Sequence, residues 1–449
     1  MNLSDLRARV AGGMPQTIAD LERLVRIPSK GYEGDDPANV RASAEATRDI
    51  LRDAGVADVR LLELAGGHPA VFGQVPGPDG SPTVLLYAHH DVQPEGPLDQ
   101  WDSPPFEPEL RDGRLFGRGA ADDKSGVVIH AAALRAFGGD VPVTVKLLIE
   151  GEEECSTAHL PELVRGNADL IRADVAVIAD SGNYRTGVPT ITSSIRGVTD
   201  CVVQVRVLDQ AQHSGSYGGP IPDALTALAR IISKLHDDDG NVAIPGLHRF
   251  EWQGADYPEE DFRSEAGTVA GLRTIGSGSI ADLVWAGPAV SVLGIDAPAI
   301  HGSSNQIVPV ARARVSLRLA PGDDAVEATT TLVTFLRDAA PWGVEVTIEG
   351  GAFDAGQGYI VDTSAPALHA ARDALAESYG VDVLETGSGG SIPLVPMLAD
   401  TFPGIDVLMW GAMDERSNIH SVNESVDLTE IEHMAVAEAL FIQKLGGDA

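Results

Sequence analysis

The sequence predicts an α/β fold whose mostly parallel sheet is interrupted by an inserted α+β unit. Before residue 195 and again after residue 352, apolar runs alternate with amphipathic helical segments, which is typical of parallel sheets. Between these parts, apolar and polar residues alternate along several runs, which is typical of half-exposed antiparallel strands. We therefore expect three segments: 1–195 and 352–449 form one domain, and 196–351 is an insertion.

The first segment opens with helical periodicity. Helices are expected over 1–27, where Pro28 and Gly31 follow, and over about 40–54, which closes at Gly55. A third helix is expected over about 125–137, stopping at Gly138-Gly139. The predicted strands of this segment are 59–62, 70–75, 83–88, 141–149 and 175–179.

The insertion reads as one β-α-β-β-α-β unit, which is the ferredoxin-like order. We expect strands over 198–208, 290–293, 311–319 and 344–348, with helices over about 222–236 and 324–339. Residues 237–286 are acidic and glycine-rich, and we expect them to be irregular. In the last segment, helices are expected over about 365–379 and 428–444, around a strand at 407–410.

Composition limits the classes of function. The chain has 449 residues with 66 acidic and 32 basic side chains, a net charge of −34, and no basic cluster. Nucleic acid and anionic membrane are therefore excluded as expected partners. The N-terminal residues do not resemble a signal peptide, and no apolar run approaches membrane-spanning length. With two cysteines far apart, Cys155 and Cys201, a cytoplasmic location is expected.

Ligand-type side chains follow four of the predicted buried strands. His89 and Asp91 follow the third strand, four glutamates lie within 150–154 after the fourth, Asp180 follows the fifth, and His420 lies in the loop after 407–410. Taken alone, the glutamate run at 150–154 is more typical of a strand that leads into a solvated acidic loop. Because ligands bind beyond the carboxyl ends of strands in open α/β sheets, four such endings at one edge indicate a metal site.

The donor set defines the metal chemistry. Histidine nitrogens and carboxylate oxygens without a thiolate suit Zn²⁺, and Mn²⁺ or Co²⁺ could be accommodated. Two histidines and three carboxylates are more than one tetrahedral ion needs, so we expect two divalent ions that share one carboxylate.

The chain resembles the dinuclear zinc peptidase family of carnosinases, aminoacylase, glutamate carboxypeptidase and succinyl-diaminopimelate desuccinylase. The resemblance covers nearly the whole chain, and the motifs Tyr-x-His-x-Asp-Val-Gln-Pro and Gly-Gly-Ser-Ile-Pro look most like the dipeptidase branch. The motifs are Tyr87–Pro94, Gly117–Lys124, Glu150–Glu154, Asp180, His213–Gly215 with Gly218-Gly219, Arg318, Gly389–Pro393 and His420–Glu424.

The resemblance implies a role for each ligand position. Asp122 would be the bridging carboxylate. His89 and Asp180 would hold one zinc ion, and Glu154 and His420 would hold the other. It also makes 1–195 and 352–449 the catalytic domain, and 196–351 a lid and dimerisation domain.

The same resemblance implies the catalytic and substrate-binding residues. Glu153 would be the general base and then the acid, and Asp91 would hydrogen-bond His89 and fix its tautomer. His213 would stabilise the oxyanion from the second subunit of a homodimer. The implied substrate-binding residues are Asn305, Arg318, Gly390 and Ser391, with Arg318 on the substrate's free carboxylate.

The predicted function is therefore the hydrolysis of dipeptides or small peptides with a free C-terminal carboxylate. An N-acyl-amino-acid amidohydrolase is the alternative, because it needs the same metals and the same carboxylate clamp. A non-catalytic binding protein on this fold is the remote alternative. Such a protein would have lost a metal ligand or the Glu153 base, and this sequence contains all of them. Ser388 stands where carnosinase-like members have a glutamate, which puts a strict requirement for a free amino terminus in doubt.

Overall fold

A computed structural model of the chain describes residues 1–350 and 355–447, which divide into two compact units. Unit 1 contains Met1–Ser193, Val361–Thr386 and Leu394 onward, and unit 2 contains Ser194–Ile360 and Gly387–Pro393. The predicted boundary at residue 351 lies outside the described residues, and the predicted domain limits stay a prediction.

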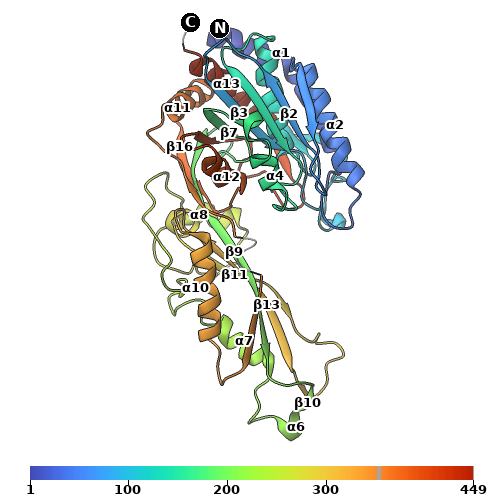
Figure 1. Cartoon of the computed structure of the whole chain (residues 1–449), viewed down its shortest axis with the longest axis vertical. Helices are drawn as coiled ribbons and strands as arrows, with labels where there is room; N and C mark the ends of the chain where they lie inside the picture. Colours follow the sequence, from blue (N-terminus) through green and yellow to red (C-terminus); the bar gives the residue numbers. More distant parts are fainter. Residues whose placement is uncertain (351–354, 448–449) are drawn as a thin grey trace. The chain divides into compact units, whose positions relative to one another are not determined.

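Unit 1 is built on a six-stranded mixed sheet (Figure 1). In spatial order its strands are β1 (Asp58–Leu62), β2 (Ala70–Val75), β6 (Thr144–Glu150), β3 (Thr83–His89), β7 (Val175–Ile178) and β17 (Asp406–Met409). The last four strands run parallel to one another, and β2 runs antiparallel to both of its neighbours, β1 and β6. The predicted mostly parallel sheet is confirmed, and β6, β3, β7 and β17 end at the same edge.

The central helix of unit 1 is α3 (Lys124–Phe137), in which every residue except Arg135 is buried. It packs against α1 (Leu3–Val25), α13 (Leu428–Leu445) and strand β3. The Asp123 side chain caps α3 by accepting a hydrogen bond from the Gly126 N–H, which fixes the chain just before the helix. The remaining helices of unit 1 are α2 (Pro37–Asp53), α4 (Leu160–Arg165), α5 (Ala168–Ile171), α11 (Pro366–Tyr379) and α12 (Leu394–Thr401).

Unit 2 contains an antiparallel four-stranded sheet in the order β11 (Ala289–Asp296), β13 (Val310–Leu319), β9 (Gly197–Arg206) and β14 (Glu345–Glu349). Helices α7 (Ala224–Ile232) and α10 (Ala325–Asp338) pack against β9 and β13 (Figure 1). Burial alternates residue by residue along β9, and the buried side chains form one core with both helices. The predicted ferredoxin-like insertion is confirmed.

Two expectations for unit 2 are wrong. Helix α7 ends at Ile232 instead of 236, because the chain turns there and His236 pairs with Val242. Residues 237–286 also contain two short helices, α8 (Glu259–Glu265) and α9 (Ile280–Trp285). Ser279 and Asp282 form a capping box at α9, a local signal that is easily missed when only one or two helical turns follow it.

Smaller elements complete the fold. Short sheets are formed by β4 (Glu109–Arg111), β5 (Arg114–Phe116) and β18 (Ser425–Asp427), by β8 (Thr190–Ile195), β15 (Tyr359–Ile360) and β16 (Leu384–Ser388), and by β10 (Gln212–His213) and β12 (Gln306–Ile307). Helix α6 (Ser214–Tyr217) follows β10. Among the described helices, none is long and apolar enough to cross a membrane.

Candidate metal centre

The parallel strands of unit 1 bring the predicted ligands together at one edge. His89 is the last residue of β3, Glu153 and Glu154 follow β6, and Asp180 comes two residues after β7. His420 lies in the loop between β17 and β18. Residues that are up to 331 positions apart therefore meet because their strands share one direction and one edge.

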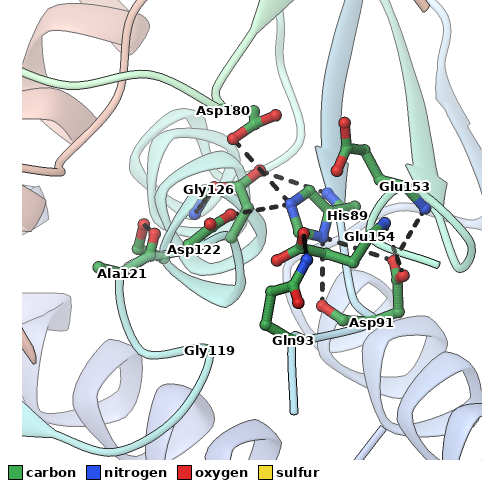
Figure 2. Close-up of polar contacts among 12 residues, drawn as sticks. His89, Asp91, Gln93, Gly119, Ala121, Asp122, Gly126, Glu153, Glu154 and Asp180 are labelled. Carbon is green, nitrogen blue, oxygen red and sulfur yellow. Dashed lines mark hydrogen bonds and ion pairs between the residues drawn. The ribbon is translucent and has the colours of Figure 1, made fainter. Parts of the chain in front are cut away.

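Asp122 lies between the two histidines. Its Oδ1 atom is 3.0 Å from His89 Nε2, and its Oδ2 atom is 2.9 Å from His420 Nε2. Each oxygen of one carboxylate thus faces a different imidazole, and Figure 2 shows the Asp122 side chain directed at the ring of His89. This is the arrangement of a carboxylate that bridges two ions.

A second carboxylate completes each half of the site. Asp180 Oδ1 is 4.0 Å from His89 Nε2, and Glu154 Oε1 is 3.3 Å from His420 Nε2. Ligand atoms on a tetrahedral zinc ion, with bonds of 2.0–2.1 Å, are roughly 3.3 Å apart. The donor set and its spacing therefore fit two divalent ions, with Asp122 between them.

Glu153 also lies at this site. One ligand atom from each of His89, Glu153 and Asp180 lies within 4.8 Å of the other two, and the same holds for His89, Asp122 and Glu154. Figure 2 shows Glu153 beside His89, next to Glu154 in the chain. The carboxylate predicted to be the base is thus within reach of a molecule bound at the His89 half of the site.

The electrostatics favour cations. Burial and the nearby Asp122 carboxylate raise the pKa of Asp180 to about 7, and burial with the Asp180 carboxylate raises the pKa of Glu153 well above its usual range. Hydrogen bonds to Asp122 and Glu154 raise the pKa of His420 to about 10. Without metal, the site therefore holds protons between its carboxylates, and divalent ions would displace them on binding.

Neighbouring groups fix the loop that contains the glutamates. Both carboxylate oxygens of Asp91 accept backbone N–H groups, from Glu153 at 3.2 Å and from Glu154 at 3.0 Å, as Figure 2 shows in part. Asp91 Oδ1 is also 3.5 Å from His89 Nδ1. The hydrogen-bond partner of His89 Nδ1 is the Asp91 backbone carbonyl at 3.2 Å, and the role of Asp91 in fixing the His89 tautomer stays a prediction. The Asp91 carboxylate also holds the turn after β6, which sequence reasoning did not foresee.

Sequence reasoning missed Gln93 and Tyr32. Gln93 Nε2 donates to Glu154 Oε2 at 2.7 Å, on the oxygen that does not face His420 (Figure 2). The Tyr32 hydroxyl donates to the Glu154 carbonyl at 2.6 Å. Gln93 belongs to the motif Tyr87–Pro94, so a signal was present for it, whereas nothing in the sequence around Tyr32 indicated this contact.

The predicted substrate-binding residues and His213 all belong to unit 2, where they form two groups. His213 in β10 pairs with Gln306 in β12, and the Ser214 N–H donates to the Asn305 carbonyl at 3.0 Å. Arg318 Nη1 donates to Ser391 Oγ at 3.1 Å, one residue beyond Gly390. Their functional roles stay predictions.

The α/β sheet with a histidine and carboxylate cluster at its carboxyl edge defines the class of metal-dependent hydrolases. Residues 85–444 match Peptidase family M20/M25/M40. The cysteinylglycine-S-conjugate dipeptidase of Corynebacterium striatum is 38% identical over 82% of each chain, and the beta-Ala-His dipeptidase of Rattus norvegicus is 27% identical over 84% of this chain and 82% of its own.

The chain therefore belongs to peptidase family M20/M25/M40, and it is a metallodipeptidase of that family. The predicted family and enzyme class are confirmed. Two solved structures share the fold: the dipeptidase Dug1p of Saccharomyces cerevisiae, with a TM-score of 0.85 over 99% of this chain and 98% of its own, and human carnosine dipeptidase 1, with 0.83 over 99% of both. Each is 22% identical to this chain, so these two comparisons concern the fold alone.

Proposed function

We propose that this metallodipeptidase cleaves dipeptides with a free C-terminal carboxylate by means of two divalent ions, with Zn²⁺ as the native metal. The observation that supports it is the position of Asp122, within 3.0 Å of one histidine and 2.9 Å of the other. Because the 38% identical relative is named for cysteinylglycine S-conjugates, we propose Cys-Gly dipeptides as the first substrates to assay. The two free cysteines suit a reducing compartment, and we propose a cytoplasmic location.

The chain's own residues would handle the protons of the reaction. The bound ions would supply Lewis-acid activation of a water molecule and of the substrate carbonyl. Glu153 would take a proton from the attacking water as the C–O bond forms, and would return it to the leaving amine as the C–N bond breaks. Asp91 would keep Glu153 in place through its backbone N–H.

An N-acyl-amino-acid amidohydrolase is the second candidate, and the residue at position 388 supports it. The Ser388 hydroxyl accepts the Gly390 N–H at 3.1 Å, so this position offers no negative charge to a substrate ammonium group. A panel of Cys-Gly and other dipeptides against N-acetyl and N-succinyl amino acids, at known zinc content, separates the two. We expect dipeptides to have at least about tenfold higher kcat/KM, equivalent to roughly 1.4 kcal/mol. The reverse order would favour the amidohydrolase.

Arg318 is proposed to bind the substrate's carboxylate. Along β13, Val315, Leu317 and Leu319 are fully buried, while Arg318 is half-buried and points to the other face. Among the described residues, its side chain donates to the neutral Ser391 hydroxyl and forms no ion pair, which leaves the guanidinium charge to be balanced by an anion. A substrate carboxylate would provide that anion.

Arg318→Ala is expected to lower kcat/KM on a free dipeptide by at least about tenfold, roughly 1.4 kcal/mol, because a partly desolvated charge pair is lost. The wild type should prefer the acid over the C-terminal amide by a similar factor, and the variant should barely distinguish them. Arg314→Ala, on the same strand but with a 59% exposed side chain paired with Asp200, is the control and should behave like the wild type. Equal wild-type rates on acid and amide would contradict the assignment.

We further propose a homodimer in which His213 of one subunit serves the metal centre of the other. His213 Nδ1 accepts the Ser216 N–H at 3.2 Å, so a neutral ring has its proton on Nε2. That Nε2–H would be a donor for the oxyanion that forms during hydrolysis.

Complementation tests this arrangement. His213→Ala and Glu153→Gln should each be inactive alone, yet their mixture should recover up to about a quarter of wild-type activity. Random exchange makes half of the dimers hybrids, and each hybrid contains one intact site of two. A fully active monomer, or a mixture no more active than its components after subunit exchange, would contradict the proposal.

A further inference from the structure

We propose that Glu424 is a positioning residue that holds Asp122 and the His420 loop in register, so that the centre binds two ions instead of one. This rests on the two-ion site proposed above. Glu424 ends the motif His420–Glu424 but has no ligand or catalytic role in it, and its side chain is fully buried.

The Glu424 carboxylate joins the two loops through four hydrogen bonds. Its Oε1 atom accepts the N–H groups of Ala121 and Asp122, both at 3.0 Å. Its Oε2 atom accepts the Gly119 N–H at 2.9 Å and Arg118 Nη1 at 2.7 Å. Both oxygens are thus used by the segment that places the bridging aspartate.

Arg118 extends this connection to a third loop. Its Nη2 atom donates to the Ser421 carbonyl at 3.0 Å and to the Pro94 carbonyl at 3.1 Å. Pro94 ends the motif that contains His89, and Ser421 follows His420. The buried Arg118–Glu424 pair therefore links the segment that follows His89 with the two loops that present Asp122 and His420.

The backbone of the His420 loop requires such support. Asn418, His420 and Asn423 have φ angles of 51°, 59° and 59°, in the left-handed region, which is uncommon for residues with a Cβ although Asn and His enter it more often than most. Conformations of this kind persist when the surrounding contacts determine them. Besides its side-chain bonds, Glu424 accepts the Gly117 N–H on its own carbonyl at 2.9 Å, which anchors the end of this loop to the Asp122 segment.

The four donors require a carboxylate. A glutamine at 424 has the same size, but one of its two terminal atoms is an NH₂ group. Whichever way the amide turns, that group meets two N–H donors, either from Gly119 and Arg118 or from Ala121 and Asp122. The substitution would therefore break the hydrogen bonds to one of the two donor pairs without changing the volume of the side chain.

The test is Zn²⁺ binding, measured by competition with a chromophoric chelator, together with the rise in Tm that Zn²⁺ causes. We expect wild type to bind two ions, and Glu424→Gln to bind the second at least tenfold more weakly, with a smaller Zn²⁺-dependent rise in Tm. Glu438→Gln is the matched control, because Glu438 is equally buried but bonded to His130. It should lower Tm with and without zinc alike and keep two ions.

If Glu424→Gln does not fold, the same measurement on Glu424→Asp tests the inference. The aspartate keeps the negative charge, but its side chain is one methylene too short to reach both sets of donors. It too should bind the second ion at least tenfold more weakly. Two ions bound with wild-type affinity by a folded position-424 variant would overturn the inference alone. A wild-type protein with fewer than two ions would overturn both the inference and the two-ion site.

Discussion

Glu153→Gln is expected to lower kcat by at least about 10²-fold while both metal ions remain bound, because a positioned general base contributes roughly 10²–10⁴ in rate. The amide keeps the size of the side chain and its backbone contact with Asp91, but it cannot accept a proton from water. KM should change little, since the proton transfer belongs to the transition state. The measurement is steady-state kinetics on a dipeptide with metal content determined on the same sample.

Glu152→Gln is the matched control for this prediction. Glu152 is the preceding residue and is buried, but its carboxylate contacts His159 Nδ1 at 2.9 Å and the His68 N–H at 3.1 Å. It should retain a kcat close to that of the wild type. A Glu153→Gln enzyme within about threefold of wild type, below the roughly 10²-fold floor for a base, would show that another group moves the proton.

Asp122→Ala is expected to abolish paired metal binding, reducing about two ions per chain to fewer than one. His89 and His420 would each lose the carboxylate oxygen that lies nearest to their Nε2 atoms. Activity should fall by more than the roughly 10²-fold expected for a lost base, because water activation and carbonyl polarisation both depend on the ions.

Elemental analysis after gel filtration, with activity measured in parallel, tests this expectation. Asp20→Ala is the control: Asp20 is also buried in unit 1, but it pairs with Arg135 at 2.6 Å instead of with a ligand. Its loss should reduce stability and leave two ions bound. A variant at Asp122 that still binds two ions would exclude it as the bridging residue.

The order of apolar runs and polar residues along the chain was enough to predict the parallel sheet and the types of ligand at its edge. Buried parallel strands are continuous apolar runs, so Thr83–His89 and Val175–Ile178 could be identified locally, and the polar residues after them had to lie at the carboxyl edge. The alternation along Gly197–Arg206 likewise predicted the antiparallel insertion. Short helices such as Ile280–Trp285 were missed, because one or two turns contain too few periodic positions.

Tertiary structure decided how those residues act together. That Asp122 lies between His89 and His420 depends on loops almost 300 residues apart meeting at one edge, which no local pattern encodes. The contacts of Gln93 with Glu154, and of Glu424 with the backbone before α3, depend on atomic distances in the folded chain. Sequence patterns specify which side chains an element presents, whereas hydrogen bonds between distant loops exist only once packing has placed both partners.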